Sequence, residues 1–169
     1  GVHKKSGFSI EPFAVINSDD ANVAYLKSVI QTKVYSFTHD RGSFEKAGVE
    51  EEIFLIDNIE EDDFLKFSIE YKKNGQIKCC KARASVSGSY NADNLVAAII
   101  VVSKLLNLEI ESVLPNLENL SPINGRMTMC EGAKDFDVII DYAHTPSSFS
   151  AVFPAIKEKA KKRGGRVIA

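Results

Sequence analysis

Short apolar runs alternate with polar, turn-forming segments along the first part of the chain. The apolar run at residues 13–16 is bounded by proline and asparagine, which predicts a short buried strand. The polar residues 17–20 offer N-caps for a helix over 21–30, and alternation at 33–37 predicts a second strand. This β-α-β order is typical of a parallel sheet covered by helices.

The middle of the chain carries a hairpin pattern. Residues 39–51 are polar and contain two glycines, so we expect a loop there. Two strand-like runs follow at 64–71 and 76–85, and Asn74-Gly75 between them is a strong hairpin signal. The first run alternates between apolar and polar side chains, which predicts an antiparallel hairpin with one apolar face and one solvent-exposed face.

A strongly apolar segment comes next. Residues 91–106 are predicted to form a helix that is apolar on nearly every side at 95–102, which indicates a buried helix. A second helix is expected over 110–120, with Pro115 near its start. The apolar run is far shorter than the roughly 20 residues that cross a bilayer, so we expect no membrane span.

The last part of the chain predicts a second α/β unit. The turn-rich residues 121–125 are the candidate boundary between a domain at 1–121 and another at 122–169. The expected elements after it are strands at 126–130 and 136–141, a helix from Thr145-Pro146 to about 162, and a strand at 166–169. Because a terminal strand needs partners, we expect the chain to be part of something longer.

Composition narrows the classes of function. The 169 residues are 44% hydrophobic and 26% charged, as in an ordinary globular protein, and carry a net charge of −2. The chain therefore lacks the basic surface expected of a nucleic-acid partner. Its three cysteines have no metal-ligand spacing, which favours reduced thiols and a cytoplasmic location.

The segment Gly-Ser-Tyr-Asn-Ala-Asp-Asn at 88–94 is the first candidate for chemistry. Asn91 and Asn94 are three residues apart and share one face of a helix start. Their amides offer the donor and acceptor that an adenine edge requires. The alternative interpretation, which spacing alone favours, makes Asn91 an N-cap and Asn94 a first-turn residue.

Two further segments follow it. Gly125-Arg126-Met127 combines a flexible turn with a bidentate donor for phosphate or carboxylate, although most single arginines are surface residues. At 137–146, an apolar strand ends in Asp141, where ligands of open α/β sheets bind, and a carboxylate there can hold ribose hydroxyls. Thr145 and Pro146 are explained as helix caps, whereas Asp141 and His144 lack a structural reason at this stage.

Together these segments resemble the ATP-dependent Mur ligases of peptidoglycan synthesis. The matching motifs are Gly-x-Tyr-Asn-x-x-Asn-x-x-Ala-Ala, Pro-x-x-Gly-Arg-Met and Asp-Tyr-Ala-His-Thr-Pro, in order over residues 88–146. Residues 13–20, Phe-Ala-Val-Ile-Asn-Ser-Asp-Asp, are similar to a fourth family motif. The resemblance is strongest to the tripeptide-forming branch, although Thr128 stands where that branch usually has glutamate.

The resemblance implies a fold and a set of sites. The fold class would be α/β: the second half of the central ATPase domain, with a parallel sheet and an antiparallel hairpin sheet, and the opening of a Rossmann-like C-terminal domain. Asn91 and Asn94 would bind adenine, Arg126 would lie near the phosphates, and Asp141 with His144 would hold the ribose side of ATP. Lys4, in Lys-x-x-x-Phe, would match the carbamylated lysine that helps hold Mg²⁺.

The implied activity belongs to a complete, monomeric enzyme. It would add a diamino acid to UDP-N-acetylmuramoyl-L-Ala-D-Glu through an acyl phosphate, using ATP and Mg²⁺. The family's P-loop would precede Gly1, so this chain would hold no catalytic residue and would not act alone. The open alternatives are a folylpolyglutamate or cyanophycin synthetase-like ligase, a non-catalytic remnant, and an unrelated α/β domain.

Overall fold

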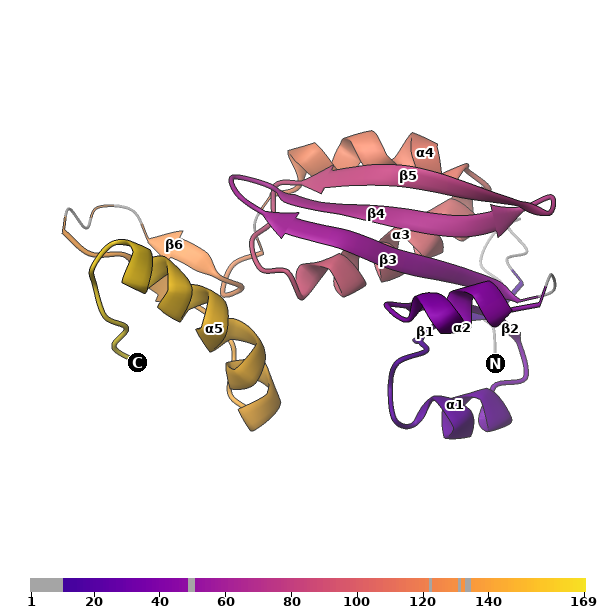
Figure 1. Cartoon of the computed structure of the whole chain (residues 1–169), viewed down its shortest axis with the longest axis horizontal. Helices are drawn as coiled ribbons and strands as arrows, with labels where there is room; N and C mark the ends of the chain where they lie inside the picture. Colours follow the sequence, from indigo (N-terminus) through magenta and orange to yellow (C-terminus); the bar gives the residue numbers. More distant parts are fainter. Residues whose placement is uncertain (1–10, 49–50, 122, 131, 133–134) are drawn as a thin grey trace, which may run out of the picture.

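A computed structural model describes residues 11–48, 51–121, 123–130, 132 and 135–169. Figure 1 shows a large sheet with helices and, beside one end of it, a smaller C-terminal unit. The large sheet has five strands in the order β1-β2-β3-β4-β5. Their bounds are β1 Phe13–Asn17, β2 Lys33–Thr38, β3 Glu52–Glu61, β4 Leu65–Lys73 and β5 Gln76–Ala84.

The first two strands confirm the predicted β-α-β unit. β1 pairs parallel to β2, and helix α1, Val23–Val29, connects them. The helix begins two residues later than predicted, and the prediction of a cap among residues 17–20 was wrong. Its N-cap is Asn22, which makes no side-chain cap bond, because the turn before it is closed by Asp20.

Two elements were missed between residues 39 and 61. Helix α2, Arg41–Lys46, replaces part of the predicted loop because the Asp40 side chain accepts from the backbone N–H groups of Gly42 and Ser43. Strand β3 then pairs parallel with β2 and antiparallel with β4. Residues 53–56 of β3 are buried on both faces, since α2 covers one face and the main core covers the other.

The predicted hairpin is confirmed. β4 and β5 pair antiparallel around Asn74 and Gly75, whose φ values of 52° and 75° are those of a type I′ turn. The alternation of β4 also holds, with Leu65, Phe67 and Ile69 on the buried face. The hairpin is continuous with the parallel strands in one sheet, because β3 is shared by both halves.

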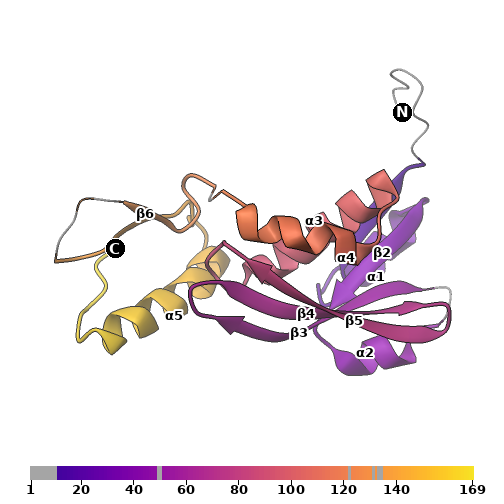
Figure 2. The same cartoon turned by 90° about the horizontal axis from the view of Figure 1, so that it is seen from above.

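Helix α3, Asn91–Leu106, has the bounds that the sequence predicts. Its buried face packs on the sheet with α4, Ile110–Val113, and with the 3-10 helix η1, Leu114–Asn119, which has Pro115 in its first turn. Figure 2 shows α3 and α4 on one face of the sheet and α2 on the other. The expectation of an all-round buried α3 was wrong, because Ala98 and Val102 within the apolar stretch 95–102 are exposed.

The C-terminal unit contains β6, Thr128–Cys130, β7, Val138–Ile140, and helix α5, Pro146–Lys162. The two strands pair antiparallel, and Thr145 caps α5 through a capping box with Ser148, as the sequence predicts for this helix start. The predicted strand at 166–169 was wrong, because these residues pair with no strand within the described part of the chain. In that same part, no helix has the length and hydrophobicity needed to cross a membrane.

Candidate functional site

The candidate site begins at a tight turn before α3. Gly88 has a φ of 95°, and its N–H donates to the Glu61 carboxylate at 2.9 Å. A Cβ at this position would lie 2.5 Å from Cε1 of Tyr90, so the aromatic ring rests directly against the glycine. Only glycine fits both this backbone conformation and this contact. The turn thereby fixes Tyr90 and the residue after it, Asn91.

The two predicted asparagines lie together in the first turn of α3. Asn94 donates from Nδ2 to Oδ1 of Asn91 at 3.0 Å, and Asn91 donates from Nδ2 to the Ser87 carbonyl at 2.6 Å. The prediction that Asn91 is the N-cap was wrong, because Tyr90 occupies that position and makes no side-chain cap bond. Asn94 is exposed, so its amide is accessible to a ligand from solvent.

Asp141 lies directly after β7 and ties two loops together. One carboxylate oxygen accepts the N–H of Ala143 at 2.8 Å, and the other accepts the N–H of Met127 at 2.9 Å. The N–H of Tyr142 donates to the Gly125 carbonyl at 2.8 Å beside them. The earlier view that Asp141 lacks a structural reason was therefore wrong. Each oxygen still has a lone pair for another donor.

Arg126 and His144 flank this carboxylate on exposed positions. Arg126 precedes Met127, whose left-handed φ of 52° makes the turn tight, and its guanidinium lies 5.9 Å from the ring centre of Tyr142. His144 donates from Nδ1 to the Tyr142 carbonyl at 2.8 Å, because a carbonyl oxygen can only accept a hydrogen bond. The Nε2 atom is then left as an acceptor.

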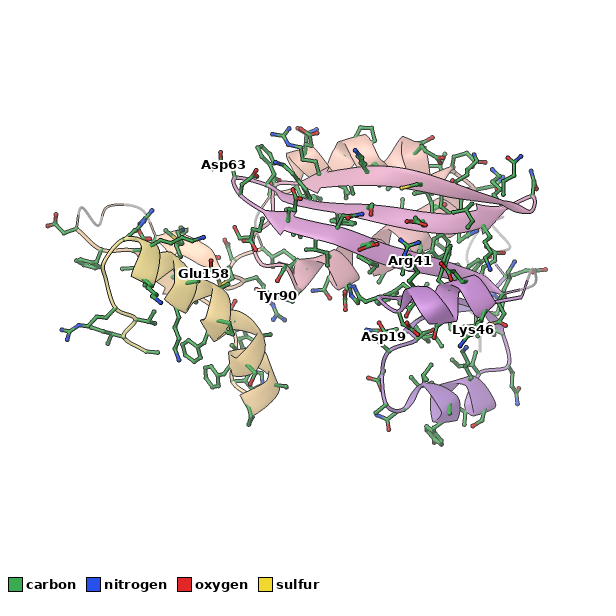
Figure 3. The ribbon with its side chains drawn as sticks, viewed as in Figure 1. Asp19, Arg41, Lys46, Asp63, Tyr90 and Glu158 are labelled. Carbon is green, nitrogen blue, oxygen red and sulfur yellow. The ribbon has the colours of Figure 1, made fainter. Side chains whose placement is uncertain are left out.

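Tyr90 directly precedes Asn91, and its hydroxyl is buried without a hydrogen-bond partner among the described residues. Burial raises the pKa of its phenol, and the nearby charge of Asp141 raises that pKa further, while Arg126 acts in the opposite direction. Figure 3 places Tyr90 at the end of the large sheet that faces the C-terminal unit.

A second polar cluster joins α3 to the carboxyl ends of β1 and β2. Asp93 accepts from Asn17 at 3.4 Å and contacts Nε2 of His39 at 2.7 Å. Asp19 accepts the N–H of His39 at 2.7 Å and also bonds Thr38. His39 was not among the predicted site residues, although its place directly after a parallel strand was a signal for a residue at the ligand-binding edge.

No metal site emerges from the residues that the structure describes. These residues contain no group of three or more histidine, cysteine or acidic side chains that could hold a metal ion. The predicted metal-associated Lys4 lies outside them. A hollow of about 570 Å³ lies between α5 and the chain end, and Asp141 is among its lining residues, but Asn91 and Asn94 are not.

Known proteins that are similar to this chain show the family to which it belongs. No protein-family model matches it. It is 32% identical over 99% of its length to a UDP-N-acetylmuramyl-tripeptide synthetase of Treponema denticola and 34% identical over 89% to one of Borreliella burgdorferi. A UDP-N-acetylmuramoyl-L-alanyl-D-glutamate–L-lysine ligase of Staphylococcus aureus is 29% identical over 92% of the chain. The chain belongs to the Mur ligase family.

Membership in the Mur ligase family sets aside the alternative of an unrelated α/β domain, and the mixed sheet agrees with a Mur ligase domain. The chain spans about a third of the length of these relatives, namely 31%, 27% and 29%. The matched region contains all the described site residues, from Asn91 to His144.

Proposed function

We propose that this chain supplies the adenosine side of the ATP site, and the hinge beside it, in an amide-forming ligase of peptidoglycan precursor synthesis. The carrying observation is that each candidate residue is held in place by hydrogen bonds: Asn91 pairs with Asn94 in the first turn of α3, and Asp141 fixes the turn that carries Arg126. These residues lie in motifs that resemble those of the Mur ligases, within a chain that aligns with such ligases over 99% of its length.

The proposed chemistry follows from the donors and acceptors present. Asn91 and Asn94 carry amides on one helix face, which suits the donor and acceptor of the adenine edge. Asp141 keeps free lone pairs for ribose hydroxyls, and Arg126 offers a charged donor to the phosphates. His144 presents Nε2 beside them. The remaining machinery lies outside this surface.

The reaction that we propose for the complete enzyme joins a diamino acid to UDP-N-acetylmuramoyl-L-Ala-D-Glu. The γ-phosphate of ATP passes to the substrate carboxylate, the amine attacks the acyl phosphate, and phosphate leaves as the amide forms. The names of the similar ligases from Treponema denticola and Staphylococcus aureus support this substrate over folate or cyanophycin substrates. The described residues offer no ligand set for Mg²⁺, so the metal and Lys4 stay predictions, as do the monomeric state and the cytoplasmic location.

The test uses the complete gene product that contains this chain. It is incubated with ATP, UDP-N-acetylmuramoyl-L-Ala-D-Glu and a panel of diamino acids that includes L-lysine, and the product is identified by mass spectrometry. We expect phosphate to be released and a tripeptide product to form with at least one diamino acid of the panel. The 169-residue chain contains no P-loop motif, so we expect no turnover by it alone. Absence of both ATP binding and product in the complete protein would refute the proposal.

A further inference from the structure

A closed ring of hydrogen bonds lies at the carboxyl ends of β1 and β2. Oδ1 of Asn17 accepts the N–H of Asp19 at 2.8 Å, and Oδ2 of Asp19 accepts the N–H of His39 at 2.7 Å. His39 in turn donates from Nε2 to Oδ1 of Asp93 at 2.7 Å, and Asn17 closes the ring by donating from Nδ2 to Oδ2 of Asp93 at 3.4 Å. The two oxygens of Asp93 thereby bind the ends of two adjacent parallel strands.

The ring fixes one particular turn of helix. Asp93 belongs to the first turn of α3, which also carries Asn91 and Asn94. Asn91 ties the same turn to the preceding loop through the Ser87 carbonyl. The turn is therefore held on two sides, to the sheet through Asp93 and to its own loop through Asn91. The bonds of the ring involve neither the amide of Asn91 nor that of Asn94, so both can face a ligand.

The start of α3 needs such support from outside the helix. The first N–H groups of any helix have no partner within it, and Tyr90, the N-cap of α3, makes no side-chain cap bond. The side chains of His39 and Asp93 are 41% and 34% exposed, and exposed pairs of this kind add little to the stability of a fold. The ring is better explained by the position that it gives to a helix end, because binding groups must be held within about 0.5 Å of their productive geometry.

We propose that His39 and Asn17 are positioning residues for nucleotide recognition, which fix the first turn of α3 through Asp93. They thereby set how strongly Asn91 and Asn94 prefer adenine to other bases. This inference rests on the proposed function, in which the two amides contact the adenine edge. A donor and an acceptor discriminate between bases only when their distances and angles to the ring are correct, so a loosened turn loses preference before it loses all affinity.

The experiment compares the complete gene product with its His39→Ala and His39→Gln variants. Calorimetry gives the dissociation constants of ATP and of purine riboside 5′-triphosphate, which lacks the amino group of adenine. We expect His39→Ala to bind ATP about 3- to 5-fold more weakly, the effect of one partly exposed pair, and to bind the analogue almost as before. His39→Gln should restore most of the preference for ATP, because its amide can donate to Asp93 in place of Nε2.

Lys73→Ala is the matched control. Lys73 forms an ion pair with Glu109, and its side chain is 37% exposed, close to the 41% of His39. Glu109 is the N-cap of α4, so this pair lies at the start of a different helix. The control variant should bind both nucleotides with the affinities of the unaltered protein.

The outcomes distinguish the inference from the function on which it rests. If the unaltered protein prefers ATP to the analogue, but His39→Ala changes neither the affinity nor the preference, then the inference alone is overturned. An equal loss for both nucleotides in His39→Ala would also overturn it, because a general loosening of the fold does not discriminate between bases. Equal affinities of the unaltered protein for the two nucleotides would overturn it as well. Failure of the unaltered protein to bind ATP would overturn both the inference and the proposed function.

Discussion

The carboxylate of Asp141 holds the backbone N–H of Met127 at 2.9 Å, across 14 residues of sequence. Met127 adopts a left-handed φ of 52°, a conformation that costs a non-glycine residue roughly 1–2 kcal/mol. The bond to Asp141 offsets part of this cost and fixes the turn that presents Arg126. Under the proposed function, Asp141 would therefore act on a nucleotide in two ways, through its own oxygens and through the position of Arg126.

Replacement of Asp141 by alanine should weaken ATP binding by about tenfold or more, since hydrogen bonds to a charged group are each worth about 1.5–3 kcal/mol. Isothermal calorimetry on the complete gene product measures the effect. Asp137→Ala is the matched control, because Asp137 pairs with Arg163 on the same unit, away from the turn. Equal affinities for the two variants would show that Asp141 has no special role.

Because part of the Asp141 effect passes through Arg126, the two residues should be coupled. The double variant Asp141→Ala, Arg126→Ala should bind ATP more tightly than the sum of the single losses predicts. A double-mutant cycle with the same calorimetric assay gives the coupling energy. Strict additivity would contradict the structural link through Met127.

Asn94→Asp replaces an amide donor by an acceptor in the first turn of α3. The new carboxylate would face Oδ1 of Asn91, which now accepts from Asn94 at 3.0 Å, so both the pair and the adenine donor are lost. We expect ATP binding to weaken by about 5- to 20-fold, while the weak binding of GTP changes little. Competition titrations with the two nucleotides test this, with the exposed Asn22→Asp as the control.

Gly88→Ala should destabilise the fold by about 1–3 kcal/mol, because a side chain there is strained at a φ of 95° and meets the Tyr90 ring at 2.5 Å. Urea unfolding of the chain measures the loss. Gly165→Ala is the matched control, since the added Cβ finds its nearest contact at an ordinary 3.5 Å. A similar stability for both variants would mean that the ring does not rest on Gly88.

Acid should remove the stabilisation that Glu52 provides. Burial disfavours its charged form, but hydrogen bonds from Lys104 and Lys33 outweigh burial and lower its pKa from the usual value of 4.5. Since the unfolded chain then binds the proton more readily, the contribution is complete above about pH 5 and is lost as the pH falls through the folded pKa.

The measurement compares the free energy of unfolding of the original chain and its Glu52→Gln variant at pH 7 and pH 3. The difference between them should be largest at pH 7 and should shrink at pH 3. The exposed Glu45→Gln variant is the control and should show a smaller difference at pH 7. A Glu52 difference that grows on acidification would reverse the predicted sign.

The sequence predicted elements whose signals are local. Asn74-Gly75 specified its turn, and the bounds of α3 followed from its long apolar run. Strand β3 was missed because its pairing with β2 and β4 depends on distant partners. The all-round burial of α3 failed for a similar reason, since apolar residues alone do not say how many neighbours will cover a helix.

For the candidate site too, local signals were predicted from the sequence and contacts between distant residues were not. Asn91, Arg126 and Asp141 were found from motif order, but motif order could not reveal that Asp141 also accepts from Met127. Tyr90 was inside a quoted motif and still escaped notice, since only coordinates reveal a buried hydroxyl without a partner. His39 and Asp93 come from segments 54 residues apart, and no local pattern joins them.

The outer strand β5 has a consequence for the behaviour of the protein in concentrated solution. Beyond its hairpin partner it lies at an edge of the five-stranded sheet, and its exposed positions include Lys78, Lys81 and Arg83. Lys78 pairs with Glu111 of α4 and Arg83 with Glu118 of η1, so a second strand that met this edge would have to displace these ion pairs. The basic residues on β5 therefore oppose the stacking of copies into extended β-aggregates, and their replacement by valine or threonine should lower the concentration at which the protein precipitates.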